Sequence, residues 1–261
     1  MPFMTMSDGC SIFYRFDGDE SAPVVMLSNS LGTTHAMWEP QMAALTERYR
    51  VLRYDNRGHG QSAVPPAPYA VDRIGTDAKE LIAGLNLSRV LFCGLSLGGI
   101  VGMWLGANAP DMLRRAVLAN TGARIGPRAM WDERLAIIAQ DGLDKVSKAV
   151  VQRWLTAPYI AEHPEAASML AAMIAATPQE GYVGAACAVR DVDLRADLPR
   201  ITVPVLVIAG SQDMSTPVAL GEQIVAGVPG ARLAILEAAH LSNIEQADQF
   251  NTLIRNFFDA A

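Results

Sequence analysis

Short apolar runs alternate with helix-forming segments along the chain, and this alternation restricts the possible folds more than any other feature of the sequence. Near-continuous apolar runs of this kind are typical of strands that are covered on both faces. Helical patterns between such runs predict βαβ units and a mostly parallel sheet. The runs are VVMLS (24–28), YRVLRYD (49–55), RVLFCG (89–94), RRAVLAN (114–120), PVLVIAG (204–210) and ARLAIL (231–236).

Two segments depart from this alternation. The opening runs FMTM (3–6) and CSIFYRFDG (10–18) alternate in polarity and are joined by a short SDG turn, which predicts an antiparallel hairpin. Between residues 124 and 190 no strand pattern occurs, and several helices with Pro and Gly breaks are expected. We therefore predict an α/β fold with a mostly parallel eight-stranded sheet flanked by helices. Residues 1–123 and 191–261 would form the core, and residues 124–190 a helical lid insertion.

Composition agrees with one compact core. Of the 261 residues, 51% are apolar and 18% are charged, which is typical of a globular protein near the upper size for a single domain. The formal net charge is −6. Because there is no basic footprint for a phosphate backbone, nucleic acid is not an expected partner.

The cysteines and the N-terminal segment indicate in which cellular compartment the protein is expected. Cys10, Cys93 and Cys187 are far apart and form no C-x-x-C pair, so neither a disulfide framework nor a zinc site is expected. The N-terminal residues contain no basic region followed by an apolar one, so no secretory signal is expected. The most apolar stretch is much shorter than the about 20 residues of a membrane helix. These features predict a cytoplasmic protein without a membrane partner.

The segment GLSLG (94–98) fits the pattern G-x-S-x-G. It follows an apolar strand and precedes a helix-forming stretch, which is the context that this motif requires. Glycines at both ends permit a sharp turn, and the turn would hold the Ser96 hydroxyl beside the positive end of the following helix. The motif predicts that Ser96 is a nucleophile. The alternative is a plain glycine-rich turn.

A serine hydroxyl is too weak an acid to attack alone, so a base and a group that orients the base are needed. After such a turn they follow in the order acid, then histidine. Asp213 lies just past the run PVLVIAG, and His240 lies after the next run. Alternatively, Asp213 is a helix cap or turn residue and His240 an ordinary loop histidine. Weaker candidates are His35, His59 and His163 for the base, and Asp197 and Glu237 for the acid.

Metal and nucleotide motifs do not match. There is no H-E-x-x-H sequence, and GLSLGG is neither G-x-G-x-x-G nor a P-loop. We therefore expect no metal and no cofactor.

These motifs together resemble the α/β-hydrolase family over essentially the whole chain. GLSLGG, Asp213, His240 and the turn YDNRGHGQS (54–62) carry the resemblance. More narrowly, LSNSLGT (27–33) and the lid segment MWDERLAII (130–138) resemble the 3-oxoadipate enol-lactonases, bacterial enzymes of the β-ketoadipate pathway for protocatechuate and catechol breakdown. The resemblance implies a serine hydrolase that opens an enol-lactone through an acyl-enzyme.

The resemblance also implies an oxyanion hole. Many α/β-hydrolases have His-Gly where this chain has Ser28-Asn29. The main-chain N–H of the next residue, Ser30, and that of Leu97 would bind the oxyanion. Because backbone donors tolerate side-chain change, the departure from His-Gly concerns specificity more than catalysis.

A lactone substrate that carries a carboxylate would need local cations in a protein of net negative charge. Trp131, Arg134 and Trp154 are the candidates in the predicted lid. Alternatively, these side chains only pack within the lid or, for the arginine, place a charge in solvent. Other possible cations for the substrate carboxylate are Arg124, Arg128 and Arg190.

Three other functions compete with the lactonase interpretation. They are a general carboxylesterase, a perhydrolase resembling the cofactor-free haloperoxidases, and a ligand-binding receptor on the same scaffold. A dehalogenase of this fold would need Asp at position 96, where this chain has Ser.

Overall fold

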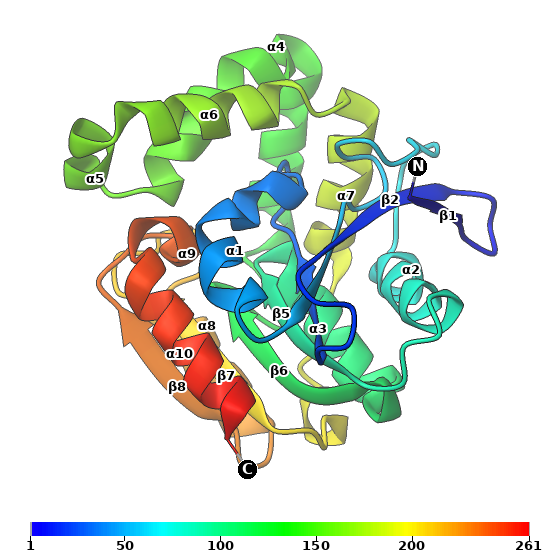
Figure 1. Cartoon of the computed structure of the whole chain (residues 1–261). Helices are drawn as coiled ribbons and strands as arrows, with labels where there is room; N and C mark the ends of the chain where they lie inside the picture. Colours follow the sequence, from blue (N-terminus) through cyan, green and yellow to red (C-terminus); the bar gives the residue numbers. More distant parts are fainter. Residues whose placement is uncertain (1, 261) are drawn as a thin grey trace.

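The structure is a computed structural model, and it describes residues 2–260. One eight-stranded sheet runs through it in the order β1-β2-β4-β3-β5-β6-β7-β8 (Figure 1). Strands β1, β2 and β4 pair antiparallel, and all pairs from β4 to β8 are parallel. The prediction of an eight-stranded, mostly parallel sheet that opens with a hairpin is confirmed. The strands are β1 (Phe3–Thr5), β2 (Ser11–Asp17), β3 (Val24–Ser28), β4 (Arg50–Tyr54), β5 (Val90–Leu95), β6 (Leu113–Ala119), β7 (Val205–Gly210) and β8 (Arg232–Leu236).

Helices cover both faces of the sheet. Helix α1 packs against α10 on one face, while α3 and α8 lie on the other, with α2 packed on α3 (Figure 1). Every residue of β5 and β7 is buried, which explains their continuous apolar sequence. The α-helices outside segment 124–190 are α1 (Glu39–Thr46), α2 (Val71–Gly84), α3 (Leu97–Asn108), α8 (Val218–Gly227), α9 (Ser242–Glu245) and α10 (Ala247–Asp259).

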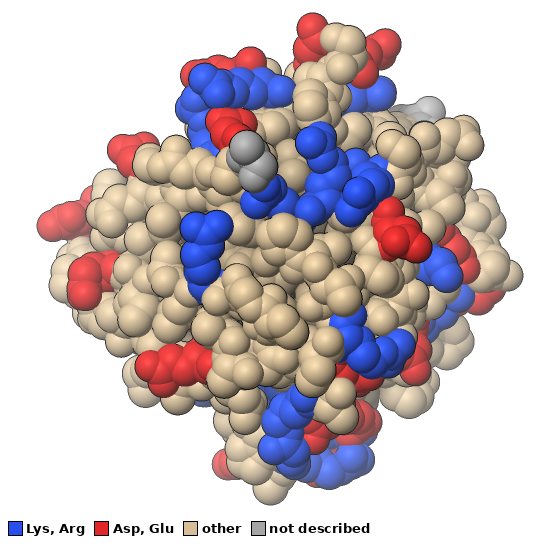
Figure 2. All heavy atoms as spheres, turned by 90° about the horizontal axis from the view of Figure 1, so that it is seen from below, with Lys and Arg blue, Asp and Glu red and all other residues tan. Residues whose placement is uncertain are grey.

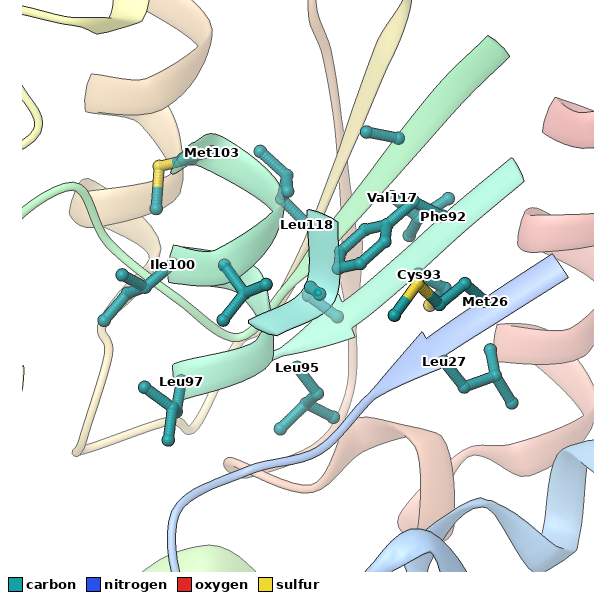
Figure 3. Close-up of a cluster of buried hydrophobic side chains, with 14 of the residues drawn as sticks. Met26, Leu27, Phe92, Cys93, Leu95, Leu97, Ile100, Met103, Val117 and Leu118 are labelled. Carbon is teal, nitrogen blue, oxygen red and sulfur yellow. The ribbon is translucent and has the colours of Figure 1, made fainter. Parts of the chain in front are cut away.

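Buried apolar side chains fill the space where α3 crosses the sheet. Phe92 of β5 and Leu118 of β6 lie between the strands and this helix (Figure 3). A Cβ atom added at Gly102 of α3 would lie 2.6 Å from both side chains. The glycine therefore lets the helix approach the strands closely, which fixes the position of its N-terminus above β5.

The strand order reverses at β3, and this places the functional loops. The chain passes from β3 to β4 on one side and then crosses to β5 on the other side of β3. Ligands bind at such a switch point, beyond the carboxyl ends of the strands. Because Ser28 pairs with Gly94, the loop after β3 lies beside the loop after β5.

Four helices between β6 and β7 lie beyond the carboxyl ends of the parallel strands (Figure 1). They are α4 (Arg128–Trp154), α5 (Ala157–Glu162), α6 (Pro164–Ala175) and α7 (Gln179–Asp191). Helix α4 packs against α6 and α7, and it is kinked at Gly142, whose φ is 78°. The division of the chain into a core and a separate lid domain remains a proposal.

The face opposite these helices carries mixed charge. Lys and Arg side chains are interspersed with Asp and Glu side chains there (Figure 2). In residues 2–260, no helix is both long and apolar enough to cross a membrane.

Candidate active site

Ser96 occupies a sharp turn between β5 and α3. Its φ is 58° and its ψ is −113°, a backbone conformation that costs about 1–3 kcal/mol in a residue other than glycine. A Cβ atom at Gly94 would lie 2.0 Å from Gly98 O, and one at Gly98 would lie 2.0 Å from Ser28 O. Only glycine fits at either position, so the G-x-S-x-G pattern follows from the geometry of the turn.

Asp213 and His240 form a buried pair at the same edge of the sheet. Asp213 follows β7 and His240 follows β8, and 2.8 Å separate His240 Nδ1 from Asp213 Oδ2. Because a carboxylate only accepts, His240 Nδ1 carries the hydrogen. Burial alone would raise the pKa of Asp213, but the charge of His240 and the hydrogen bonds from His240 and Thr216 outweigh it and lower the pKa to about 2. The carboxylate is therefore ionised at neutral pH.

One small cavity of about 40 Å³ joins the elements of the site. Ser96 and His240 both line it, together with Ser30 and Leu31 of the loop after β3. Within residues 2–260 no hydrogen bond joins Ser96 to His240, and catalytic hydrogen bonds are often longer before substrate binds. The ring of Trp154 lies 5.9 Å from the imidazole of His240, centroid to centroid.

The side chains of Ser28 and Asn29 anchor the loop after β3. Ser28 Oγ lies 2.7 Å from Tyr54 Oη. Asn29 donates to Tyr54 O at 2.7 Å and accepts from Trp38 Nε1 at 2.9 Å. Neither side chain lines the cavity. The departure from His-Gly is therefore structural, a role that could not be read from the sequence because both partners are distant in the chain.

The main-chain N–H groups of this loop differ in whether they have a hydrogen-bond acceptor. The N–H of Ser30 donates to Met37 Sδ at 3.3 Å, and that of Gly32 donates to His59 Nε2 at 3.0 Å. In the described part of the chain the N–H of Leu31 has no partner. The N–H of Leu97 belongs to the first turn of α3, where helices leave amides without intrahelical acceptors. The N–H groups of Leu31 and Leu97 are thus candidate donors, and the predicted Ser30 N–H, whose acceptor is the weak thioether of Met37, stays a prediction.

The three candidate substrate-binding residues all line the cavity. Trp131 donates through Nε1 to Ile125 O at 2.7 Å. The guanidinium of Arg134 lies 5.3 Å from the Trp131 ring centroid and donates to Tyr182 Oη. Across residues 2–260, no carboxylate pairs with Arg134.

Arg153 is a second cation at the cavity, and the sequence analysis missed it. It lines the small cavity and also an adjoining one of about 330 Å³. It has no ion-pair or hydrogen-bond partner in the described chain. A straight helix would separate residues 134 and 153 by about 28 Å. The kink at Gly142 folds α4 back, so both cations reach the same cavity.

The remaining candidates lie elsewhere. None of the other histidines, acids or arginines considered above lines the cavity. His35 bonds Asp55, His59 bonds Gly32, His163 faces Glu165, Asp197 pairs with Arg200, Glu237 accepts from Ser211, Arg124 pairs with Asp193, Arg128 with Asp191, and Arg190 with Asp132 and Asp191.

Among the residues that the structure describes, no cluster of three or more His, Cys, Asp or Glu side chains could hold a metal ion. The three cysteines are free and buried.

The fold and this constellation of residues define a class. The sequence matches the alpha/beta hydrolase family over residues 24–253, and the chain belongs to that family. The 3-oxoadipate enol-lactonase 2 of Acinetobacter baylyi is 39% identical over 238 residues, which are 91% of this chain and 89% of that protein.

Two solved structures are similar over nearly their whole length. The enol-lactonase from Burkholderia xenovorans LB400 is 40% identical with a TM-score of 0.97, and the match covers 99% of this chain and 100% of that one. A hydrolase from Pseudomonas aeruginosa PA01 is 46% identical with a TM-score of 0.95, covering 99% and 98%. The predicted resemblance to the α/β-hydrolases and enol-lactonases is confirmed, and hydrolase activity is supported.

Proposed function

We propose that the protein hydrolyses 3-oxoadipate enol-lactone to 3-oxoadipate in the catabolism of protocatechuate or catechol. One observation carries the proposal. The cavity that holds Ser96 and His240 is also lined by Arg134 and Arg153, two cations without carboxylate partners in the described chain. A small ester that carries a carboxylate complements such a cavity in charge.

The reaction begins with attack by Ser96. His240 Nε2 takes the proton of the Ser96 hydroxyl as Oγ bonds to the lactone carbonyl carbon. Asp213 holds Nδ1–H of His240 and stabilises the imidazolium that forms. The amides of Leu31 and Leu97 then bind the tetrahedral oxyanion, where each donor is worth about 10²–10³ in rate.

Collapse of the oxyanion breaks the bond between the carbonyl carbon and the ring oxygen. The leaving group is an enolate, which is more stable than an ordinary alkoxide, and His240 supplies its proton. The ring-opened chain stays attached to Ser96 as an ester. His240 then takes a proton from water as the water oxygen attacks the ester carbonyl carbon. The bond from that carbon to Ser96 Oγ breaks, His240 returns the proton to Ser96 Oγ, and the released enol tautomerises to the 3-oxo acid.

Arg134 and Arg153 are suited to hold the carboxylate of the lactone. A planar guanidinium binds a carboxylate through two parallel hydrogen bonds. Burial raises the pKa of Tyr182, and the charges of Arg134 and Arg153 oppose that rise, as expected if both cations lie near one point. Trp131 and Trp154 would form apolar walls beside the ring.

The helices between β6 and β7 would act as the lid of this site. Seven of the residues around the cavity belong to segment 124–190, including both cations. Closure of such a segment excludes water and strengthens the electrostatic interactions inside the cavity. The cytoplasmic location expected from the sequence stays a prediction.

The substrate is tested by comparing two esters. The rate of enol-lactone loss, followed by absorbance, is measured beside hydrolysis of a neutral aryl acetate. We expect a higher kcat/KM for the enol-lactone by orders of magnitude, because only this substrate uses the two cations. Preference for the aryl acetate by a similar factor would instead indicate a general carboxylesterase.

A further inference from the structure

The hydroxyl of Ser30 is an unpartnered polar group inside the candidate active site. Ser30 is fully buried and lines the cavity that holds Ser96 and His240. Its Oγ has no hydrogen-bond partner in the described chain. Leaving a buried hydroxyl without a partner destabilises the folded state, so a group in this position calls for an explanation.

The neighbouring polar groups show that the loop does not depend on this hydroxyl for its shape. Ser28 and Asn29 bond to Tyr54. Thr33 Oγ1 donates to Ser30 O at 2.8 Å and also contacts Met37 Sδ at 3.0 Å. Each of these side chains has protein partners, and only the hydroxyl that lines the cavity has none.

The backbone of Ser30 is fixed on both sides. Its N–H donates to Met37 Sδ at 3.3 Å, and its carbonyl accepts from Thr33 N at 3.3 Å and from Thr33 Oγ1. The backbone that carries the hydroxyl is therefore held in place. The hydroxyl has no protein acceptor to give up when a ligand acceptor arrives.

We propose that Ser30 Oγ–H donates a third hydrogen bond to the oxyanion, beside the amides of Leu31 and Leu97. This assignment rests on the proposed hydrolysis at Ser96. The pairing of Ser28 with Gly94 brings the loop beside the nucleophile turn, and Ser30 precedes Leu31 directly. A hydrogen bond to a full negative charge is stronger than one to a neutral carbonyl. The Ser30 contact is thus strongest in the transition state.

The test is the variant Ser30→Ala, assayed with both the enol-lactone and a neutral aryl acetate. Since the contact strengthens only as the oxyanion forms, kcat should fall about 10- to 100-fold for both esters with little change in KM. Removing an unpartnered buried hydroxyl should also raise the Tm, by about 2–4 °C. A lower kcat with a higher Tm is a combination that a merely structural role would not produce.

Thr33→Val is the matched control for stability. It removes a buried hydroxyl from the same loop, but one with protein partners, so its Tm should fall. The proposal is overturned if Ser30→Ala keeps kcat within about twofold, changes only KM, or lowers Tm and kcat together. If wild type does not open the enol-lactone, the proposed substrate is wrong, and the Ser30 assignment is still decided on the aryl acetate.

Discussion

Asp213→Asn removes the carboxylate charge that accepts the hydrogen bond from His240 Nδ1. Asp213 Oδ1 accepts from the amides of Ser215 and Thr216 at 2.8 and 2.9 Å. Its Oδ2 accepts from His240 Nδ1, Thr216 Oγ1 and Asn120 Nδ2. An asparagine that keeps its oxygen toward the two amides turns its NH₂ group toward these donors. His240 would then be held in the wrong tautomer, with Nε2 protonated and unable to act as the base.

The magnitudes follow from this arrangement. The wrong tautomer should lower kcat about 10⁴-fold. The pKa of Asp213 lies at about 2 instead of 3.8, and one pKa unit corresponds to about 1.4 kcal/mol, so the ionised group stabilises the folded state by about 2 kcal/mol. Because the folded pKa is the lower one, this stability is present above pH 3.8 and is lost as the pH falls through about 2.

The assays are steady-state turnover of the enol-lactone and urea unfolding across the acidic range. The free energy of unfolding of Asp213→Asn should therefore fall less than that of wild type as the pH is lowered, because the variant has no carboxylate to protonate at this position. Asp197→Asn is the control, since Asp197 pairs with Arg200 away from the cavity and its loss should leave kcat unchanged. If Asp213→Asn kept kcat within tenfold of wild type, His240 would not depend on Asp213, and the assignment of the acid would be wrong.

Three further predictions concern the turn, the cations and a buried histidine. Gly98→Ala places a Cβ atom 2.0 Å from Ser28 O and should lower the free energy of unfolding by about 1–3 kcal/mol or more; an unchanged urea midpoint would contradict this. Arg134→Met and Arg153→Met should each lower kcat/KM for the enol-lactone about 10- to 100-fold and spare the neutral aryl acetate; equal losses on both esters would point to lid packing instead. Burial lowers the pKa of His59 from 6.5, so stability should fall as the pH drops below about 6.5, and His59→Gln should weaken that dependence in urea unfolding; an unaltered pH profile would mean that His59 is not the responsible group.

Local signals in the sequence were sufficient for the sheet and the order of the site residues. The runs that became β5 and β7 are apolar throughout because both faces of each strand are covered. Gly94 and Gly98 are required by contacts within a few residues and with the adjacent strand. That Asp213 and His240 lie together could be predicted because each stands in the loop after a strand of the same parallel sheet.

The features that the sequence did not reveal depend on contacts between distant segments. Which amide of the loop after β3 is free depends on Met37 and His59, which take the N–H groups of Ser30 and Gly32. The position of Arg153 depends on the kink at Gly142. Neither interaction has a local pattern, so each required the folded structure.

The hydrogen bonds that anchor Ser28 and Asn29 also join segments that are distant in the sequence. Both side chains occupy a place where a sequence comparison with the α/β-hydrolases suggests a difference in specificity. Their partners Tyr54 and Trp38 are instead part of the packed interior. A change at this position is therefore compatible with an unchanged site, because neither side chain lines the cavity.

The nucleophile assignment of Ser96 is the central claim, and the turnover of Ser96→Ala tests it most directly. The loss of enol-lactone is followed with wild type, Ser96→Ala and the control Ser168→Ala, whose exposed hydroxyl donates to Pro164 O. Ser96→Ala should lose about 10⁴- to 10⁶-fold in kcat while remaining folded, and Ser168→Ala should match wild type. A folded Ser96→Ala variant with turnover within tenfold of wild type would contradict the acyl-enzyme mechanism.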